Sequence, residues 1–189
     1  MKISTNFDIQ IAHSVTEIGQ ETWDRLTGDR PFTSYRWYRF GEAMLDDNTP
    51  IYIILSLQGE PVALGTFWLR WREQLPITLK AARWLLEAIL RRRPLLTCRS
   101  PLVETAGLVL PDEPELRDSA LSTIARIARE QAQRHRVSFL MFDYLEKHEA
   151  ASPGWPDTFL PFEMADPGTR LHVAWDDFDS YVAHLRKSQ

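Results

Sequence analysis

The stretch Gly107-Leu-Val-Leu-Pro-Asp-Glu-Pro-Glu115 carries the chain from an apolar strand into a long helix. At such a junction the first helical N–H groups and the helix dipole favour an anion, so bare amides would form a phosphate site. Here the corner holds three carboxylates and two residues without an N–H group: Asp112, Glu113, Glu115, Pro111 and Pro114. The sequence therefore predicts a strand-to-helix corner that cannot grip a phosphate.

Hydrophobic periodicity on either side of this corner predicts a mixed α/β order. Short apolar or alternating runs predict strands over 7–12, 51–57, 61–71, 102–110, 137–142 (buried) and 169–174. Apolar residues at helical spacing predict helices over 14–27, 34–45, 77–92, 116–134 and 176–189. Four prolines between 145 and 168 predict an extended loop, with a short strand near 159–164. This order predicts a mixed central sheet flanked by helices.

The composition is that of one globular domain. The chain has 189 residues, of which 44% are hydrophobic, which is enough to bury a core. A formal charge of -4 argues against nucleic-acid binding. Cys98 is the sole cysteine, so the chain has no internal disulfide and no paired-cysteine metal site. With no signal-like or membrane-spanning apolar run, we expect a soluble cytoplasmic protein without a metal.

Several short stretches carry a resemblance to a known family: Trp23-Asp-Arg-Leu26, Pro31-Phe-Thr-Ser34 with Trp37, Gly59-Glu-Pro-Val-Ala63, Ser100-Pro-Leu-Val-Glu104, Thr169-Arg-Leu-His-Val173 and Phe178-Asp-Ser-Tyr-Val-Ala-His-Leu185. Together with the order of elements, they make the chain resemble the GNAT (acyl-CoA N-acyltransferase) superfamily. It is most similar to the Fem-type branch, the peptidoglycan aminoacyltransferases and FemAB-like proteins, which carry two such domains in tandem. The resemblance implies one GNAT-like domain over 1–174 and, over 175–189, the start of a helix leading into a second domain.

The resemblance also implies where a cofactor would be held. Cofactor-using members have a Gln/Arg-x-x-Gly-x-Gly/Ala loop between the central strand and the next helix, and this chain has Pro111-Asp-Glu-Pro114 there. We therefore expect no bound cofactor. The expected partner is a C-terminal GNAT-like domain, or a second copy of the chain in its place.

Glu104 is the candidate catalytic carboxylate, because it lies on the predicted strand 102–110 in the stretch that carries the resemblance. A carboxylate on the central strand of an acyltransferase fold can act as a general base toward an amine. An acid that simply faces water at the end of a strand is the other interpretation. A nucleophilic trio of Cys98, His135 and Asp143 lacks an activating motif, and the five histidines lack the spacing of metal ligands.

A basic segment precedes the central strand. Between Arg70 and Arg93 there are seven basic side chains and two acidic ones, a local charge of +5 that leaves -9 for the rest of the chain. The predicted helix 77–92 is amphipathic, so it either packs on the sheet with a solvated basic edge or lies on an anionic membrane or phosphorylated lipid. The candidate contacts for an anionic surface are Lys80, Arg83, Trp84, Arg91, Arg92 and Arg93.

Four aromatic residues crowd the second predicted helix: Tyr35, Trp37, Tyr38 and Phe40. Aromatic side chains usually belong to the core. One helix face cannot bury all four, so we expect at least one of them to line a groove or an interface.

Three functions remain open. The first is the N-terminal, non-donor domain of a Fem-like acyl or aminoacyl transferase that acts on an amine acceptor. The second is a single-domain N-acetyltransferase that uses acetyl-CoA directly, with Glu104 as base. The third is a catalytically silent domain that binds a partner or a membrane surface.

Overall fold

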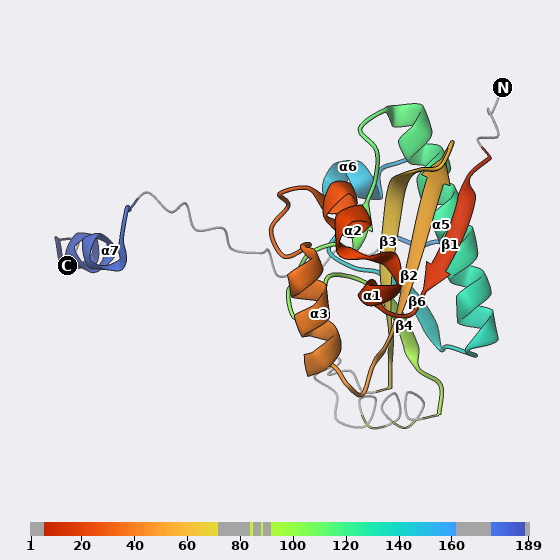
Figure 1. Cartoon of the computed structure of the whole chain (residues 1–189). Coiled ribbons are helices and arrows are strands. Elements are labelled where there is room, and N and C mark those ends of the chain that lie inside the picture. Colours follow the sequence, from red (N-terminus) through yellow and green to blue (C-terminus); the bar gives the residue numbers. More distant parts are fainter. Residues whose placement is uncertain (1–5, 72–83, 85–87, 89–91, 162–174, 188–189) are drawn as a thin grey trace. The chain divides into compact units, whose positions relative to one another are not determined.

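A computed structural model describes residues 6–71, 84, 88, 92–161 and 175–187 of the chain (Figure 1). The chain divides into two compact units, Met1–Phe159 and Leu160–Gln189. The expected domain 1–174 and the final strand 169–174 stay predictions, because 162–174 lie outside the described residues. No described helix has the length and apolar character that crossing a membrane requires.

The strands of the first unit are β1 (Asp8–Ala12), β2 (Thr49–Leu57), β3 (Glu60–Arg70), β4 (Leu95–Cys98), β5 (Leu108–Val109) and β6 (Phe139–Phe142). Its described helices are α1 (Val15–Ile18), α2 (Gln20–Thr27), α3 (Tyr35–Met44), α5 (Pro114–Arg134) and α6 (Lys147–Ala150). Helix α7 (Phe178–Lys187) belongs to the second unit.

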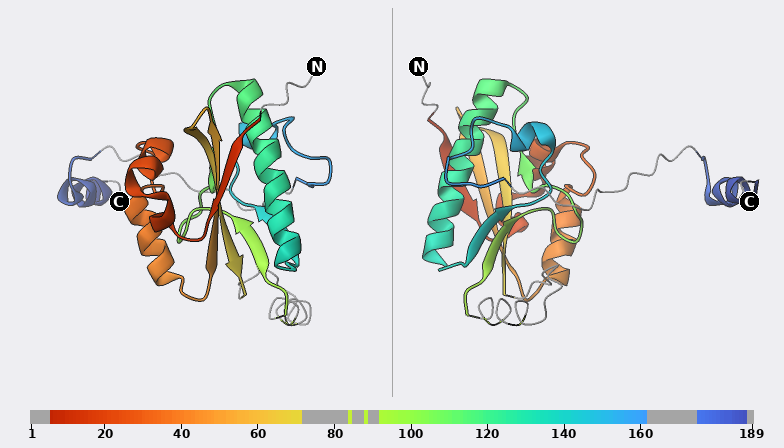
Figure 2. Two further views of the ribbon diagram at one scale, coloured as in Figure 1. Left: turned by 45° about the vertical axis from the view of Figure 1, so that its right-hand side comes forward. Right: turned by 180° about the vertical axis from the view of Figure 1, so that it is seen from behind.

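The sheet runs in the order β1-β2-β3-β4-β6, and β5 pairs with β3 beside β4. All described pairs are antiparallel except β4 with β6, which are parallel and joined through α5. Helices α1, α2 and α3 cover one face of the sheet and α5 covers the other (Figure 2). The mixed α/β fold expected from the order of elements is confirmed.

Alternation along the strands divides the core between the two faces. On β2, Ile51, Ile53 and Leu55 pack toward α5, whereas Tyr52 and Ile54 pack toward α1 to α3. The α5 layer is mainly aliphatic. The other layer is built on rings: Trp23, Tyr38, Tyr52 and Trp68, all at most 2% exposed, lie within edge-to-face or tilted contact of one another.

Strands β4 and β5 form one interrupted strand against β3. Leu95 to Cys98 pair with Arg70 to Phe67, and Leu108 and Val109 pair with Gly65 and Leu64. Thr66 lies between the two sets, where its N–H donates to Gly107 O (2.8 Å) and its carbonyl accepts from Arg99 N (3.2 Å). The residues 100–106 therefore leave the sheet as a loop and return to the same register.

This loop corrects the predicted strand 102–110. Only Leu108–Val109 is a strand within that range, and Glu104 lies exposed in the loop rather than on a central strand. The loop is closed by the bridge between Arg99 and Ala106 and by the bond from Ser100 N to Thr105 O (3.0 Å). The apolar run misled the prediction because Leu102 adopts a positive φ of 64° and is 47% exposed, so it turns away from the sheet.

Three further expectations are corrected. The helix 14–27 is broken into α1 and α2 at Gly19, whose φ of 85° is not helical. Strand β6 is not fully buried, since Phe139 is 51% and Met141 is 41% exposed. Helix α7 begins at Phe178 and not at residue 176, and the Asp177 carboxylate accepts from the Ser180 N–H (2.7 Å).

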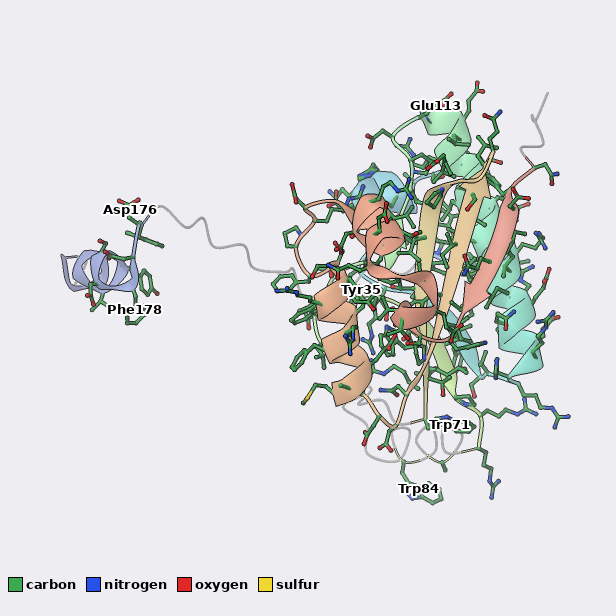
Figure 3. The ribbon with its side chains drawn as sticks, in the orientation of Figure 1. Tyr35, Trp71, Trp84, Glu113, Asp176 and Phe178 are labelled. Carbon is green, nitrogen blue, oxygen red and sulfur yellow. The ribbon has the colours of Figure 1, made fainter. Side chains whose placement is uncertain are left out.

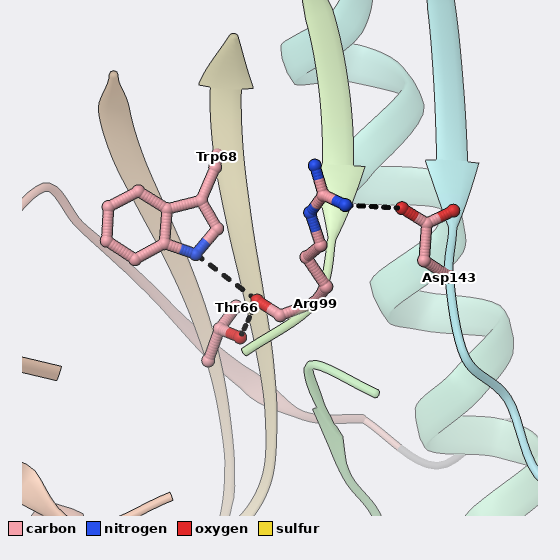
Figure 4. A network of polar contacts seen from close by, with 4 residues as sticks. All are labelled: Thr66, Trp68, Arg99 and Asp143. Carbon is pink, nitrogen blue, oxygen red and sulfur yellow. Dashed lines mark hydrogen bonds and ion pairs between the residues drawn. The ribbon is translucent and has the colours of Figure 1, made fainter. Parts of the chain in front are cut away.

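Side-chain hydrogen bonds hold the two parts of the interrupted strand in place. The Thr66 hydroxyl lies 2.8 Å from the Tyr38 hydroxyl, 3.2 Å from Gly107 O and 3.3 Å from Arg99 O. Trp68 Nε1 donates to the same Arg99 carbonyl at 3.2 Å (Figure 4). One threonine side chain thus joins α3, β3 and both ends of the 100–106 loop.

We predict that Gly107→Ala destabilises the protein. A Cβ at this position would meet Arg99 N and Thr66 Oγ1 at 2.6 Å and Thr66 O at 2.7 Å, and backbone atoms cannot move aside locally. We expect a loss of about 1–3 kcal/mol in the free energy of unfolding, measured by urea denaturation. The control is Gly59→Asn, because Gly59 has open space around it and asparagine tolerates its turn conformation. Equal losses in the two variants would contradict the close approach at Gly107.

A double-mutant cycle tests the Thr66–Tyr38 contact. Thr66→Val leaves the buried Tyr38 hydroxyl without this partner and should cost about 1–3 kcal/mol. Tyr38→Phe removes the other hydroxyl of the pair. Because both mutations remove the same hydrogen bond, the double variant should lose about 1 kcal/mol less than the sum of the single losses. Strict additivity in urea denaturation would show that the two hydroxyls are not coupled.

Candidate functional site

The corner between β5 and α5 is the first candidate site, and the ligand it would hold is an anion. Helix α5 starts at Pro114, and Glu113 is its N-cap residue with φ -65° and ψ 121° but without a side-chain cap bond (Figure 3). The side chains of Asp112, Glu113 and Glu115 are exposed around this first turn. The predicted acidic corner is therefore formed as the sequence indicated.

A small cavity of about 60 Å³ lies beside the corner. Its lining combines the chain before α5 with side chains from a loop and from α6: Arg30, Leu110, Pro111, Asp112, Arg117, His148 and Glu149. Ser152 Oγ, just after α6, donates to Asp118 Oδ1 on α5 at 2.5 Å. The segment around α6 therefore packs against the start of α5.

This geometry does not fit a diphosphate. Pro111 and Pro114 have no N–H to direct at it, and the neighbouring carboxylates repel a dianion. The cavity of about 60 Å³ has room for a few water molecules only. Arg30 and Arg117 face it, but Asp112 and Glu149 line the same walls and offset their charge.

The second candidate site is the point where β4 and β6 separate. The two parallel strands stay in register up to Cys98 and Phe142, and the Asp143 N–H donates to Cys98 O at 3.1 Å. Immediately beyond, Arg99 Nη1 lies 3.8 Å from Asp143 Oδ2 (Figure 4). These side chains are 15% and 17% exposed, so the ion pair is largely buried.

The surroundings of this cluster shift the pKa values of Asp143 and Tyr144. Burial raises the pKa of Asp143, and the Arg99 guanidinium only partly opposes the shift. Burial and then the Glu104 carboxylate raise the pKa of Tyr144, whose φ of 58° is unusual for an aromatic residue. The cluster thus joins a cation, a carboxyl with a raised pKa and a phenol with a raised pKa. Groups of this kind can take up or donate a proton.

Glu104 belongs to this cluster, but it lies in a loop that the sequence did not predict. Its carboxylate acts on Tyr144 from the 100–106 loop and not from a strand. The Arg99–Asp143 pair was missed altogether. The β-prone run Leu95-Leu-Thr-Cys98, bounded by Pro94 and Pro101, was the available signal for β4, and recognising that strand would have placed Arg99 at its end.

The trio of Cys98, His135 and Asp143 is not a catalytic arrangement. Cys98 is 1% exposed, and burial raises its thiol pKa well above the ordinary value, so it is held as a neutral thiol. His135 is exposed at the C-terminal cap of α5. Among the described residues, no three side chains of metal-ligating type come together.

The third place is an open recess of about 480 Å³ on the outer side of α2 and α3, which we name the α3 recess. It is lined by Gln20, Tyr35, Arg36, Arg39 and Phe40. The aromatic group of this helix is divided as expected. Tyr38 is 2% exposed in the core, whereas Phe40 is 49% exposed and borders the recess.

Most of the basic segment lies outside the described residues, including Lys80, Arg83 and Arg91. Of the remaining candidates, Trp84 is 69% exposed, and Arg92 and Arg93 are exposed as well. Contact with an anionic surface through this segment stays a prediction.

Comparisons with known proteins identify the fold. No family model and no curated protein sequence matches the chain. The structure is similar to that of ribosomal-protein-alanine N-acetyltransferase from Brucella melitensis biovar Abortus 2308, with a TM-score of 0.52 and 12% identity over 88% of this chain and 100% of that chain. A structure of a probable acetyltransferase is 8% identical over 89% of this chain and 99% of that chain, with a TM-score of 0.44. The chain has a GNAT-like fold, as expected.

Asp143→Asn should change how stability depends on pH. The folded state raises the pKa of Asp143 above its ordinary value of 3.8, so it binds more protons than the unfolded state between the two pKa values. The free energy of unfolding should therefore fall as pH rises through that window in the wild type, and this contribution should be absent from the variant.

Urea denaturation from pH 3.5 to pH 7, as the difference between wild type and variant, measures the effect. The control is Asp157→Asn, an exposed carboxylate whose removal should leave the wild-type profile unchanged. A difference between Asp143→Asn and wild type that does not vary with pH, or that varies with the opposite sign, would contradict the assigned shift.

Proposed function

We propose that this chain is the acceptor-side, non-donor domain of an N-acyltransferase of the Fem type. The single observation that carries the proposal is the corner before α5, where Pro111 and Pro114 remove N–H donors and three carboxylates surround the first helical turn. A donor with a diphosphate, such as acetyl-CoA, does not fit there. In this arrangement a second domain of the same fold supplies the donor site.

The reaction class rests on the fold. The similar Brucella structure is of a protein named as a ribosomal-protein-alanine N-acetyltransferase, which transfers an acyl group to an amine. In such a reaction a neutral amine attacks the acyl carbonyl, and the enzyme contributes by positioning the two groups and stabilising the oxyanion. We propose the same reaction class for this chain, with its own residues acting on the acceptor.

The residues Arg99, Glu104, Asp143 and Tyr144 at the end of β4 and β6, which we name the β4–β6 cluster, are the proposed reaction-facing part of the domain. Asp143 with its raised pKa and the Glu104 carboxylate are the groups able to accept the proton that the attacking amine loses. Arg99, already paired with Asp143, keeps positive charge beside them. Glu104 is the more accessible of the two acids because its loop is exposed.

One observation favours a second candidate. The chain covers 100% of the Brucella structure, so a single domain of this size is sufficient for the fold of that enzyme. A single-domain acetyltransferase that binds acetyl-CoA directly is therefore the alternative, and it requires a donor site other than the usual amide cradle.

Isothermal titration with acetyl-CoA separates the two candidates. We expect no saturable heat up to about millimolar ligand, because Pro111 and Pro114 take two N–H donors away from the corner and its carboxylates leave it without net positive charge. A GNAT-fold enzyme that uses acetyl-CoA, titrated in the same buffer, serves as the positive control. Micromolar binding to this chain would overturn the proposed role and support the single-domain alternative.

The variant Glu113→Ser with Pro114→Ala gives a second measurement. It removes one carboxylate from the corner and restores one N–H group at the first helical position, while serine is a good N-cap residue. We expect this variant to bind inorganic pyrophosphate at least as well as the wild type does. Weaker binding by the variant would show that the acidic, proline-containing corner is not what excludes the anion.

A further inference from the structure

The α3 recess carries positive charge next to apolar surface. Arg36, Arg39 and Phe40 occupy the i, i+3 and i+4 positions of α3, so they share one face of the helix. Tyr35 and Gln20 complete the recess of about 480 Å³, and Tyr35 is labelled in Figure 3. The apolar side extends along the same helix and the chain before it, where Phe32 is 48%, Phe40 is 49% and Met44 is 58% exposed.

The two guanidinium groups are exposed and form no ion pair with any residue that the structure describes. Asp24 on α2, which contacts two residues of the recess, is already engaged, because its Oδ1 accepts from Tyr35 N (3.0 Å) and its Oδ2 accepts from Gln20 Nε2 (3.1 Å). Glu42 on α3 is also engaged, since it accepts from Val15 N and from the Tyr52 hydroxyl. Local acids therefore leave Arg36 and Arg39 available.

Ring contacts and hydrogen bonds of Trp37 support the apolar side of the surface. Trp37 lies between Phe32 and Phe40, with ring centroids 5.2 Å and 6.0 Å away, and its Nε1 donates to Pro101 O at 3.0 Å and to Ser100 Oγ at 3.2 Å. A ring fixed by two hydrogen bonds supports its neighbours, so less conformational entropy is lost when a partner binds. Exposed aromatic side chains beside arginine are typical of the central residues of protein interfaces.

We propose that the α3 recess binds an acidic peptide segment of a partner protein, with two carboxylates on Arg36 and Arg39 and an apolar side chain against Phe40. Guanidinium groups form bidentate pairs with carboxylates, and their spacing on α3 matches acidic residues one helical turn apart on the partner. The exposed rings then bury the apolar face of that segment. This inference concerns a surface outside the β4–β6 cluster and does not depend on the proposed function.

Charge complementarity favours a short acidic segment over an extended polyanion. The recess offers two cations, and the exposed Asp46 and Asp47 follow the C-cap residue of α3, Leu45. The formal charge of the whole chain is -4. A membrane surface or a nucleic acid would bring its charge against these acids, whereas a segment with two carboxylates meets Arg36 and Arg39 alone.

Fluorescence anisotropy with the full chain tests the proposal. The probe is a labelled helical peptide of about fifteen residues that carries glutamate pairs one turn apart on one face and leucine and phenylalanine on the other. The comparison peptide has glutamine at every glutamate. We expect saturable binding of the acidic peptide that weakens as salt is added, and binding of the glutamine peptide that is about tenfold weaker or absent.

Three variants locate the binding. Arg36→Gln with Arg39→Gln should weaken binding of the acidic peptide about tenfold, and Phe40→Ser should weaken it about fivefold with less effect on its salt dependence. The matched control is Arg126→Gln with Arg134→Gln, which removes the same charge from α5 on the other face of the sheet. We expect the control to bind as the wild type does. All four exposed arginines and Phe40 lie outside the core, and circular dichroism verifies that each variant is folded.

Three results would overturn the proposal. They are no binding of the acidic peptide by the wild type at millimolar concentration, equally tight binding of the glutamine peptide, and a loss of affinity in the α5 control as large as that in the α3 variant. Vesicles of anionic lipid and a single-stranded oligonucleotide are measured in parallel. Tighter binding of either one, lost in Arg36→Gln with Arg39→Gln, would assign the recess to that class of ligand instead.

Discussion

The Thr66 hydroxyl is the contact on which the arrangement of this molecule depends. It lies against the Tyr38 hydroxyl of α3 and against the carbonyls of Arg99 and Gly107, the two residues at which the 100–106 loop leaves and rejoins the sheet. Since Thr66 is 1% exposed, water cannot replace these bonds, and an unpaired buried polar group costs about 1–3 kcal/mol. The loop is therefore held by a buried network and not by its own sequence preferences.

The interruption at Thr66 decides where the candidate site lies. Because β4 ends at Cys98 and the chain then turns outward, Arg99 meets Asp143 at the end of β6, and the loop presents Glu104 to the same cluster. An uninterrupted strand would have kept Arg99 and Glu104 in the ladder, where their side chains alternate between the two faces of the sheet. The same interruption makes β5 short, so the chain enters α5 through the proline-containing, acidic corner soon after it.

Two surfaces of the molecule bear on its proposed function: the corner before α5 and the α3 recess. The corner before α5 carries negative charge, and two of its residues are prolines without an N–H group, so it supports the proposal of a domain that does not hold the donor. The α3 recess carries positive charge and exposed rings, so it supports attachment to an acidic partner. In the proposed function, the β4–β6 cluster acts on an acceptor amine while the donor lies on another domain.

The sequence by itself determined the strand pair β2–β3, the long helix α5, the acidic corner at 111–115 and, through its resemblance, the GNAT-like fold, but it predicted neither β4 nor α6. These features are local: periodicity, turn residues and proline positions act within one element. Only the tertiary structure decided the break at Gly19, the loop that displaces Glu104 and the pairing of Arg99 with Asp143. The last two depend on hydrogen bonds and charges from residues far apart in the chain. An apolar run such as 102–110 does not reveal which residues Thr66 and Trp37 will hold out of the sheet.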